Sequence, residues 1–114
     1  MLSTYCMNFK IESLEEFEKE LKRLSKKYSS IKADFENLLY DLISNPQQGK
    51  PLGKDCYKIR MAISSKRQGK SGGARVITCV KITKAKIYLV AIYDKSDLDN
   101  ISDAELNERL KNIF

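Results

Sequence analysis

The chain has 114 residues, of which 42% are hydrophobic and 32% are charged, a composition that predicts one globular domain spanning residues 1–114. No apolar run approaches the roughly 18 residues of a membrane-spanning helix, and the N-terminus lacks a signal-peptide pattern, so we expect a cytoplasmic protein without membrane association. The sequence contains no histidine, which excludes Ser-His-Asp and Cys-His catalysis. Cys6, Cys56 and Cys79 form no metal-binding pattern, so we expect small apolar residues in a reducing compartment and no metal site.

The positive charge is concentrated in the middle of the chain. Residues 49–95 contain twelve Lys or Arg residues and only two acids, Asp55 and Asp94, whereas the remaining residues contain nine basic and thirteen acidic side chains. Such a basic centre suits a polyanion, and nucleic acid is the first candidate. The alternative is that these lysines lie on solvated strand faces, where they discourage strand pairing with other chains.

The first half of the chain predicts one strand and two helices. Residues 4–11 are short, aromatic and β-branched, which indicates a strand. Ser13 followed by Glu16 fits a capping box, so we expect Ser13 to cap a helix that ends near Lys27. A second helix with one apolar face is expected at residues 31–43, and together the two helices predict a helical hairpin.

The second half predicts three strands and a final helix. After a loop with glycine and proline at residues 45–55, the apolar residues alternate with a period of two. We expect strands at 56–64, 74–82 and 86–94, followed by a helix at 103–113 that Ser102 caps. The last strand is almost entirely apolar and should lie inside the sheet. The order βααβββα predicts an α+β fold with an N-terminal helical hairpin, a C-terminal helix and an antiparallel sheet, its helices packed on one face.

Residues 58–75 carry the pattern most suggestive of chemistry. Five basic side chains, two of them on strands and three in the loop between, could clamp several phosphates, and three glycines would let the backbone approach them. The five side chains, from Arg60 onward, are Arg60, Lys66, Arg67, Lys70 and Arg75, and the glycines are Gly69, Gly72 and Gly73. A nucleotide-binding phosphate loop is excluded, because no glycine stands five residues before Gly69. The alternative is a loop that is basic and glycine-rich only to remain soluble.

Four motifs together resemble a known family. They are K-I-R at residues 58–60, G-K-S-G-G-A-R-V-I at 69–77, I-Y-D-K at 92–95 and D-x-x-x-I-S-x-x-E-L at 97–106. This pattern, which covers the chain from about residue 53 to 110, resembles the RelE/ParE superfamily of bacterial type II toxins, and most closely the HigB-type RelE toxins. The resemblance implies a RelE-like fold.

The resemblance also implies a function and partners. It implies a toxin that is paired with a cognate antitoxin and that cleaves mRNA on the ribosome. In such cleavage the RNA 2′-hydroxyl is the nucleophile and a 2′,3′-cyclic phosphate is the product, without a metal or small-molecule cofactor.

Site residues follow from matching this sequence to the family pattern. Arg75 is expected at the scissile phosphate and Arg60 at a second phosphate contact. Lys70 belongs to the basic loop, which is expected to contact RNA and to take part in proton transfer, and Tyr93 is expected to act as a base or to stack on a nucleobase. The expected RNA contacts are Lys66, Arg67, Lys70 and Lys95. Each residue also has a structural alternative; for example, Arg75 would pair with Asp94 or Asp55, and Tyr93 would lie at the edge of the core.

Two other functions remain open from the sequence. A ParE-like toxin shares the fold but poisons DNA gyrase, which does not need a phosphate clamp. A non-catalytic nucleic-acid-binding module would use the same basic patch without cleavage.

Overall fold

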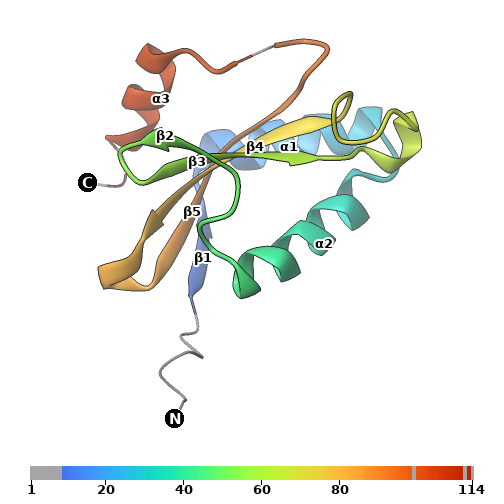
Figure 1. The fold of residues 1–114 in the computed structure, drawn as a ribbon. Coiled ribbons are helices and arrows are strands. Elements are labelled where there is room, and N and C mark those ends of the chain that lie inside the picture. Colours follow the sequence, from blue (N-terminus) through green and yellow to red (C-terminus); the bar gives the residue numbers. More distant parts are fainter. Residues whose placement is uncertain (1–8, 99, 112, 114) are drawn as a thin grey trace.

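Three α-helices and a five-stranded sheet make up the part of the chain that the computed structural model describes, which is residues 9–98, 100–111 and 113 (Figure 1). The helices are α1 (Glu15–Lys27), α2 (Ile31–Ser44) and α3 (Asp103–Leu110). The strands are β1 (Lys10–Ser13), β2 (Lys50–Gly53), β3 (Cys56–Met61), β4 (Ala74–Lys81) and β5 (Lys86–Asp94). Two short 3₁₀ turns, η2 (Ser64–Lys66) and η3 (Ile82–Lys84), lie in the loops before and after β4. None of the described helices is long and apolar enough to cross a membrane.

The sheet has the order β1-β5-β4-β3-β2 and is mixed, so the prediction of a wholly antiparallel sheet was wrong. β1 pairs with β5 in parallel, while the other neighbouring strands are antiparallel. Parallel pairing is possible because the two helices and three other strands lie between β1 and β5 along the chain, a connection long enough to return in the same direction. β5 lies inside the sheet as predicted.

The N-terminal strand lies later in the sequence than expected. Residues 4–8 of the predicted strand are outside the described residues, and β1 runs on to Ser13, which pairs with Leu89 of β5. Ser13 therefore does not cap α1: Leu14 occupies the cap position and makes no side-chain capping bond. By contrast, Ser102 caps α3 as predicted, because its side chain accepts a hydrogen bond from the backbone of Glu105.

The predicted loop at residues 45–55 contains the short strand β2. All four of its residues are exposed, and it pairs only with β3, at the edge of the sheet. Pro51 within it and Gly53 at its end hide its strand character in the sequence, because a proline is tolerated in an edge strand.

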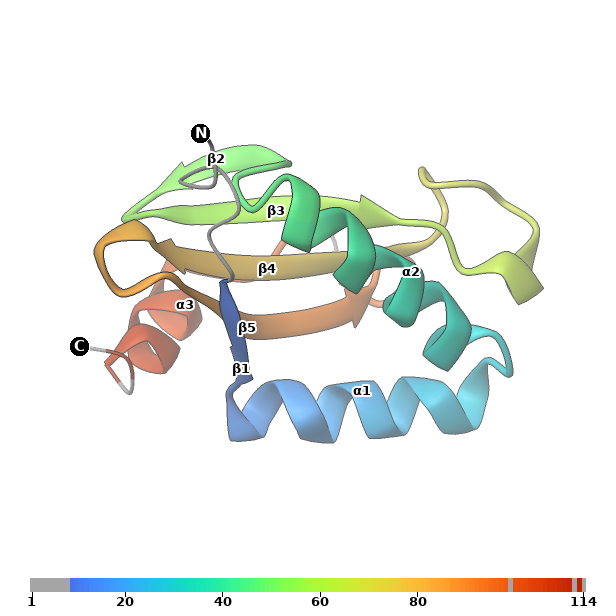
Figure 2. The same cartoon turned by 90° about the horizontal axis from the view of Figure 1, so that it is seen from below.

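The helices cover both faces of the sheet, so the prediction that they share one face was wrong (Figure 2). α1 and α2 pack together on one face, where the rings of Phe17 and Phe35 lie 5.4 Å apart. α3 packs on the opposite face, through Leu106 and Leu110. Side chains of β5 contribute to this second core as well. A bulge opposite β4 interrupts the alternation of β5, so that two consecutive residues, Val90 and Ala91, both lie in the core on the α3 side.

Cys56 and Cys79 are buried thiols, as expected for small apolar residues, and they lie directly opposite each other on β3 and β4. Cys6 lies outside the described residues.

Arg109 of α3 and Glu20 of α1 form a buried ion pair that covers part of the edge of β5. β1 pairs with β5 only as far as Leu89, so the next polar groups of β5 have no strand partner on that side. The Glu20 carboxylate accepts from the backbone N–H of Ile92 (3.2 Å), and the Arg109 guanidinium donates to the carbonyl of Val90 (3.0 Å). The Arg109 guanidinium also donates to the Glu20 carboxylate at 2.8 and 2.9 Å, and these hydrogen bonds to Glu20 raise the pKa of Arg109. Side chains thus replace strand pairing along this stretch.

Candidate functional site

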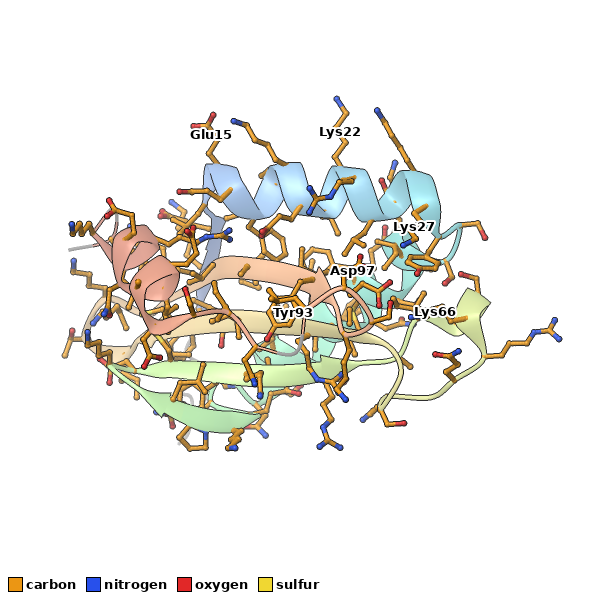
Figure 3. The ribbon with its side chains drawn as sticks, turned by 90° about the horizontal axis from the view of Figure 1, so that it is seen from above. Glu15, Lys22, Lys27, Lys66, Tyr93 and Asp97 are labelled. Atoms are coloured by element: carbon orange, nitrogen blue, oxygen red, sulfur yellow. The ribbon has the colours of Figure 1, made fainter. Side chains whose placement is uncertain are left out.

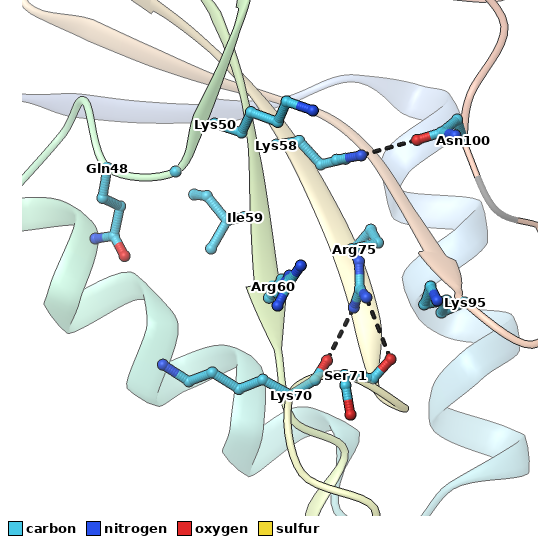
Figure 4. A pocket seen from close by; sticks show the side chains of 11 residues that line it. Gln48, Lys50, Lys58, Ile59, Arg60, Lys70, Ser71, Arg75, Lys95 and Asn100 are labelled. Carbon is cyan, nitrogen blue, oxygen red and sulfur yellow. Dashed lines mark hydrogen bonds between the residues drawn. The ribbon is translucent and has the colours of Figure 1, made fainter.

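A basic pocket opens on the α3 side of the sheet, where β2, β3 and β4 meet the loop before β4 (Figure 4). Its volume is about 810 Å³. Six of its eleven lining residues are cations and none is acidic: Lys50, Lys58, Arg60, Lys70, Arg75 and Lys95. We call this site the basic pocket. Its charge and size suit a polyanion with several phosphates.

Strand alternation explains how these cations gather. Lys58 and Arg60 are two residues apart on β3 and therefore point to the same face of the sheet. The register places Arg60 directly opposite Arg75 of β4 and Lys58 opposite Lys50 of β2. The predicted proximity of Arg60 and Arg75 is confirmed.

Arg75 is the most firmly held of the six cations. Only 3% of the residue is exposed, and its guanidinium donates to the backbone carbonyls of Lys70 (2.9 Å), Ser71 (3.2 Å) and Ala74 (3.2 Å). In the part of the chain that the structure describes, neither Asp94 nor Asp55 forms an ion pair with it. Burial lowers the pKa of Arg75, and the nearby charge of Arg60 lowers it further.

These bonds use only part of the donor capacity of the Arg75 guanidinium. A guanidinium has five N–H groups. Nη1 uses two of them and Nη2 one, which leaves Nε–H and the second N–H of Nη2 without a hydrogen bond to any described residue. Arg75 also lines the basic pocket, so these remaining N–H groups are candidate donors to a phosphate bound there.

Lys58 is an unusual lysine in this setting. Its ammonium donates to the side-chain oxygen of Asn100 at 2.8 Å, which is a neutral partner. Burial lowers the pKa of Lys58, and the neighbouring charges of Lys50 and Arg75 lower it further. A lysine with a lowered pKa transfers a proton more readily near neutral pH than an ordinary one.

Tyr93 lies opposite Arg75 in the register of β5, but it is buried and does not line the basic pocket. It lines an adjoining cavity of about 190 Å³ together with Lys58 and Asn100. Interaction with Tyr93 raises the pKa of Arg75, opposing the larger effect of burial.

The basic loop divides between two environments. Lys70 lines the pocket, whereas Lys66 and Arg67 do not. Lys66 lies in the loop between β3 and β4 (Figure 3). Its ammonium donates to the buried carboxylate of Asp94 at 2.9 Å and lies over the ring of Tyr28. The structure therefore brings together Arg60, Lys70, Arg75 and Lys95 among the predicted site residues, and it places Lys66, Arg67 and Tyr93 outside the pocket lining.

The glycines of the loop have different roles from those predicted. Gly69 has a φ of +66°, a conformation that favours glycine. Gly73 is needed for packing, because a Cβ there would collide with the backbone of Met61 and Ala62 at the end of β3. A Cβ at Gly72 would collide with the side chain of Gln68. Gly72 and Gly73 thus bring the loop close to its own neighbours, and their packing gives no evidence of a close approach to phosphate.

Seven of the eleven lining residues were not predicted as site residues: Gln48, Gly49, Lys50, Lys58, Ile59, Ser71 and Asn100. The sequence did contain a signal for Lys58, since it is two residues before Arg60 in a predicted strand and therefore lies on the same face. Lys50 had none, because the strand that carries it was not predicted. Among the described residues, no group of three or more His, Cys, Asp or Glu side chains is placed to hold a metal ion.

A comparison with protein-family models identifies the family of this chain. The family model described as the RelE toxin of the RelE/RelB toxin-antitoxin system matches residues 17–113. The chain belongs to the RelE toxin family, as its motifs predicted. A comparison with curated protein sequences found no significant match.

Solved structures agree on the fold. The free Escherichia coli toxin RelE, in an arginine-to-alanine double mutant, is 20% identical with a TM-score of 0.60, covering 94% of this chain and 99% of that one. The isolated E. coli RelE toxin in another crystal form is 21% identical with the same TM-score, over 93% and 99% of the two chains. The match to the intact E. coli RelBE toxin-antitoxin complex also has a TM-score of 0.60, at 21% identity, and covers 75% of this chain and 95% of that one.

Proposed function

We propose that this RelE-family toxin is a ribosome-dependent endoribonuclease that cleaves mRNA in the basic pocket and thereby inhibits translation in the cytoplasm. The observation that carries the proposal is the position of Arg75: three backbone carbonyls fix its guanidinium at the lining of a pocket that contains five other cations. A donor group fixed in this way stabilises the charge that develops on a phosphate during cleavage, without needing to reorganise.

In the proposed reaction the nucleophile and the leaving group both belong to the RNA, and the protein supplies charge stabilisation and proton transfer. The RNA 2′-oxygen attacks the adjacent phosphorus, the bond from phosphorus to the 5′-oxygen breaks, and a 2′,3′-cyclic phosphate forms. A base must take one proton from the 2′-hydroxyl, a role for which Tyr93 and Lys70 stay the predicted candidates, and an acid must deliver one proton to the departing 5′-oxygen. Arg75 and Arg60 would bind the phosphate oxygens, and Lys58, with its lowered pKa, would donate the proton to the leaving oxygen.

The remaining predicted residues have supporting roles in this proposal. Lys70 and Lys95 line the pocket and would contact the RNA backbone on either side of the cleaved bond, and exposed Arg67 would contact RNA further along the loop. Whether Tyr93 acts as a base or a stacking residue stays a prediction, because its side chain lines the adjoining cavities.

The antitoxin is the second proposed partner. The E. coli relative was crystallised as an intact RelBE toxin-antitoxin complex. We infer by this likeness that the present chain has a cognate antitoxin protein. An acidic antitoxin segment would be attracted to the six cations of the basic pocket. The particular likeness to HigB-type toxins also stays a prediction.

The test is in vitro translation with the purified protein, reading the mRNA by primer extension in the presence and absence of ribosomes. We expect cleavage only during translation, and a loss of about 100- to 1,000-fold in rate for Arg75→Ala. Arg23→Ala, which removes an exposed arginine of α1 outside the pocket, is the matched control and should cleave like the wild type. Intact mRNA with normal translation would refute the nuclease, and supercoiling by DNA gyrase and plain RNA binding would then be measured.

A further inference from the structure

Asp94, at the end of β5, is a buried carboxylate that no step of the proposed reaction uses. Its side chain is fully buried, and it binds groups from three separate segments of the chain. It accepts hydrogen bonds from the Tyr28 hydroxyl just after α1, from Lys66 in the basic loop (2.9 Å) and from Ser96 after β5 (2.8 Å from the hydroxyl). A buried charge with this many partners fixes the relative positions of the segments that supply them.

The loop that Asp94 binds is the same loop that holds Arg75. Residues 62–73 connect β3 to β4, and Lys66 lies near their start. Near their end, the carbonyls of Lys70 and Ser71 accept from the Arg75 guanidinium. The loop is therefore attached at two points, to Asp94 near one end and to Arg75 near the other.

Asp34 of α2 reinforces the first attachment. Its carboxylate accepts from the backbone and the hydroxyl of Ser64, two residues before Lys66. Ser30, in the link between the helices, accepts from the backbone of Ser65 at 2.9 Å. The start of the loop is thus fixed to the two N-terminal helices, on the opposite side of the molecule from α3.

We propose that Lys66 is a positioning residue: its pair with the buried carboxylate of Asp94 sets the course of the loop so that the carbonyls of Lys70 and Ser71 hold Arg75 in place at the basic pocket. The predicted effect on the rate of cleavage rests on the proposed function. The conformational order of the Arg75 side chain does not depend on that function and can be measured on the protein alone. It also gives Lys66 a different role from the direct RNA contact that the sequence predicted.

The first experiment follows the Arg75 guanidinium directly by NMR. At low temperature the Nη protons of a guanidinium give separate signals only when its bonds rotate slowly, as they do when carbonyls hold them. Arg75 is assigned by the signals lost in Arg75→Lys. We expect separate Arg75 signals in the wild type and in Lys66→Arg, which keeps the charge, and averaged signals in Lys66→Met. Unchanged Arg75 signals in Lys66→Met would overturn the proposal.

Hydrogen exchange separates positioning from general loss of stability. The backbone N–H of Gly73, which donates to Lys70, should exchange at least about tenfold faster in Lys66→Met, whereas that of Ile77, in the middle of β4, should not change. Equal acceleration at both amides would mean that Lys66 only stabilises the whole fold, which would also overturn the proposal. If Lys66→Met fails to fold, Ser64→Ala, which weakens the neighbouring attachment to Asp34, is measured in its place, and an unchanged Arg75 spectrum in it would likewise count against the proposal.

The cleavage assay then tests the consequence for catalysis. In single-turnover cleavage on programmed ribosomes, Lys66→Met should lower the maximal rate on the order of 100-fold through misplacement of Arg75, with the half-saturating concentration unchanged. Arg67→Met, the matched removal of an exposed cation from the same loop, should change the half-saturating concentration instead. A wild type that cleaves nothing refutes the nuclease, while the NMR result still decides the role of Lys66. A rise in half-saturating concentration alone for Lys66→Met would indicate a direct RNA contact and overturn positioning.

Discussion

Arg60 and Arg75 lie directly opposite each other on β3 and β4, so the sheet places two positive charges side by side. The charge of Arg60 lowers the pKa of Arg75, after the larger effect of burial. Like charges at directly opposed positions of a sheet destabilise the folded state. This arrangement favours a bound polyanion, which would remove the repulsion, over any purely structural use of the two arginines.

Replacing Arg60 should therefore stabilise the protein while weakening RNA binding. We expect Arg60→Gln to raise the free energy of unfolding by ~0.2–1 kcal/mol, measured by urea denaturation at low salt. The gain should shrink as salt is added, because ions screen the repulsion at this exposed position. Arg23→Gln on α1 is the matched control, and a destabilised or salt-insensitive Arg60→Gln would contradict the interpretation.

Lys58 should release its proton at a lower pH than an ordinary lysine. Its pKa is lowered by burial first and by neighbouring cations second, so the unfolded chain binds more protons than the folded one between the two pKa values. In that pH range the contribution of Lys58 to the free energy of unfolding rises with pH. The measurement is an NMR titration of labelled lysine side chains, assigned with Lys58→Arg. Inorganic phosphate should raise the pKa of Lys58, and a Lys58 that titrates with the bulk of the lysines would contradict the prediction.

Asp94→Asn should be strongly destabilising at neutral pH. Burial by itself raises the pKa of this carboxyl, but hydrogen bonds from Tyr28, Lys66 and Ser96 outweigh that effect and hold it well below its usual range. The charged form therefore contributes stability above the unfolded pKa of about 4, and the contribution is lost as the pH falls through the folded value. Removing the charge leaves Lys66 without its partner at a cost of ~3–5 kcal/mol.

Urea denaturation across pH tests this assignment. The difference in the free energy of unfolding between the wild type and Asp94→Asn should be largest near pH 7 and should shrink toward acidic pH. Asp103→Asn, at an exposed position in α3, is a control for a carboxylate without such burial. A difference that is constant with pH would show that Asp94 acts through packing alone.

Gly73→Ala should disrupt the junction between the loop and β3. The added Cβ would meet the backbone of Met61 and Ala62, which cannot move without shifting β3, and such overpacking costs ~1–3 kcal/mol. Gly69→Asn is the comparison, because asparagine tolerates positive φ and open space surrounds Gly69. Thermal unfolding of both variants checks the prediction, and equal stability would contradict it.

Most of the fold was predicted from the periodicity of apolar residues in the sequence. The helices and the three long strands have strong apolar patterns, and their type and order were predicted correctly. β2 was missed because a strand of four residues contains too few alternations to show a period. The end of β1 was misplaced because Ser13 followed by Glu16 matches the pattern of a helix cap. The side of the sheet that α3 covers depends on a bulge in β5, and a bulge in a continuous apolar run leaves no mark in the sequence.

The site was predicted in part for a similar reason. Arg60, Lys70, Arg75 and Lys95 meet because strand alternation and register are regular. The sequence could not show that Lys66 lies outside the pocket lining. Its partner in the structure, Asp94, is 28 positions away in the chain. Burial decides which cations of a basic segment face a ligand, and burial is a property of the whole fold.

The ion pair of Glu20 and Arg109 has a consequence for how the molecule avoids self-association. An open strand edge is a template on which another chain can add a strand. Along the second half of β5, the backbone groups of Val90 and Ile92 that a new strand would need are already bound by these two side chains. A guanidinium and a carboxylate, supplied by helices on different faces of the sheet, thus block strand addition along the stretch of β5 that β1 does not cover.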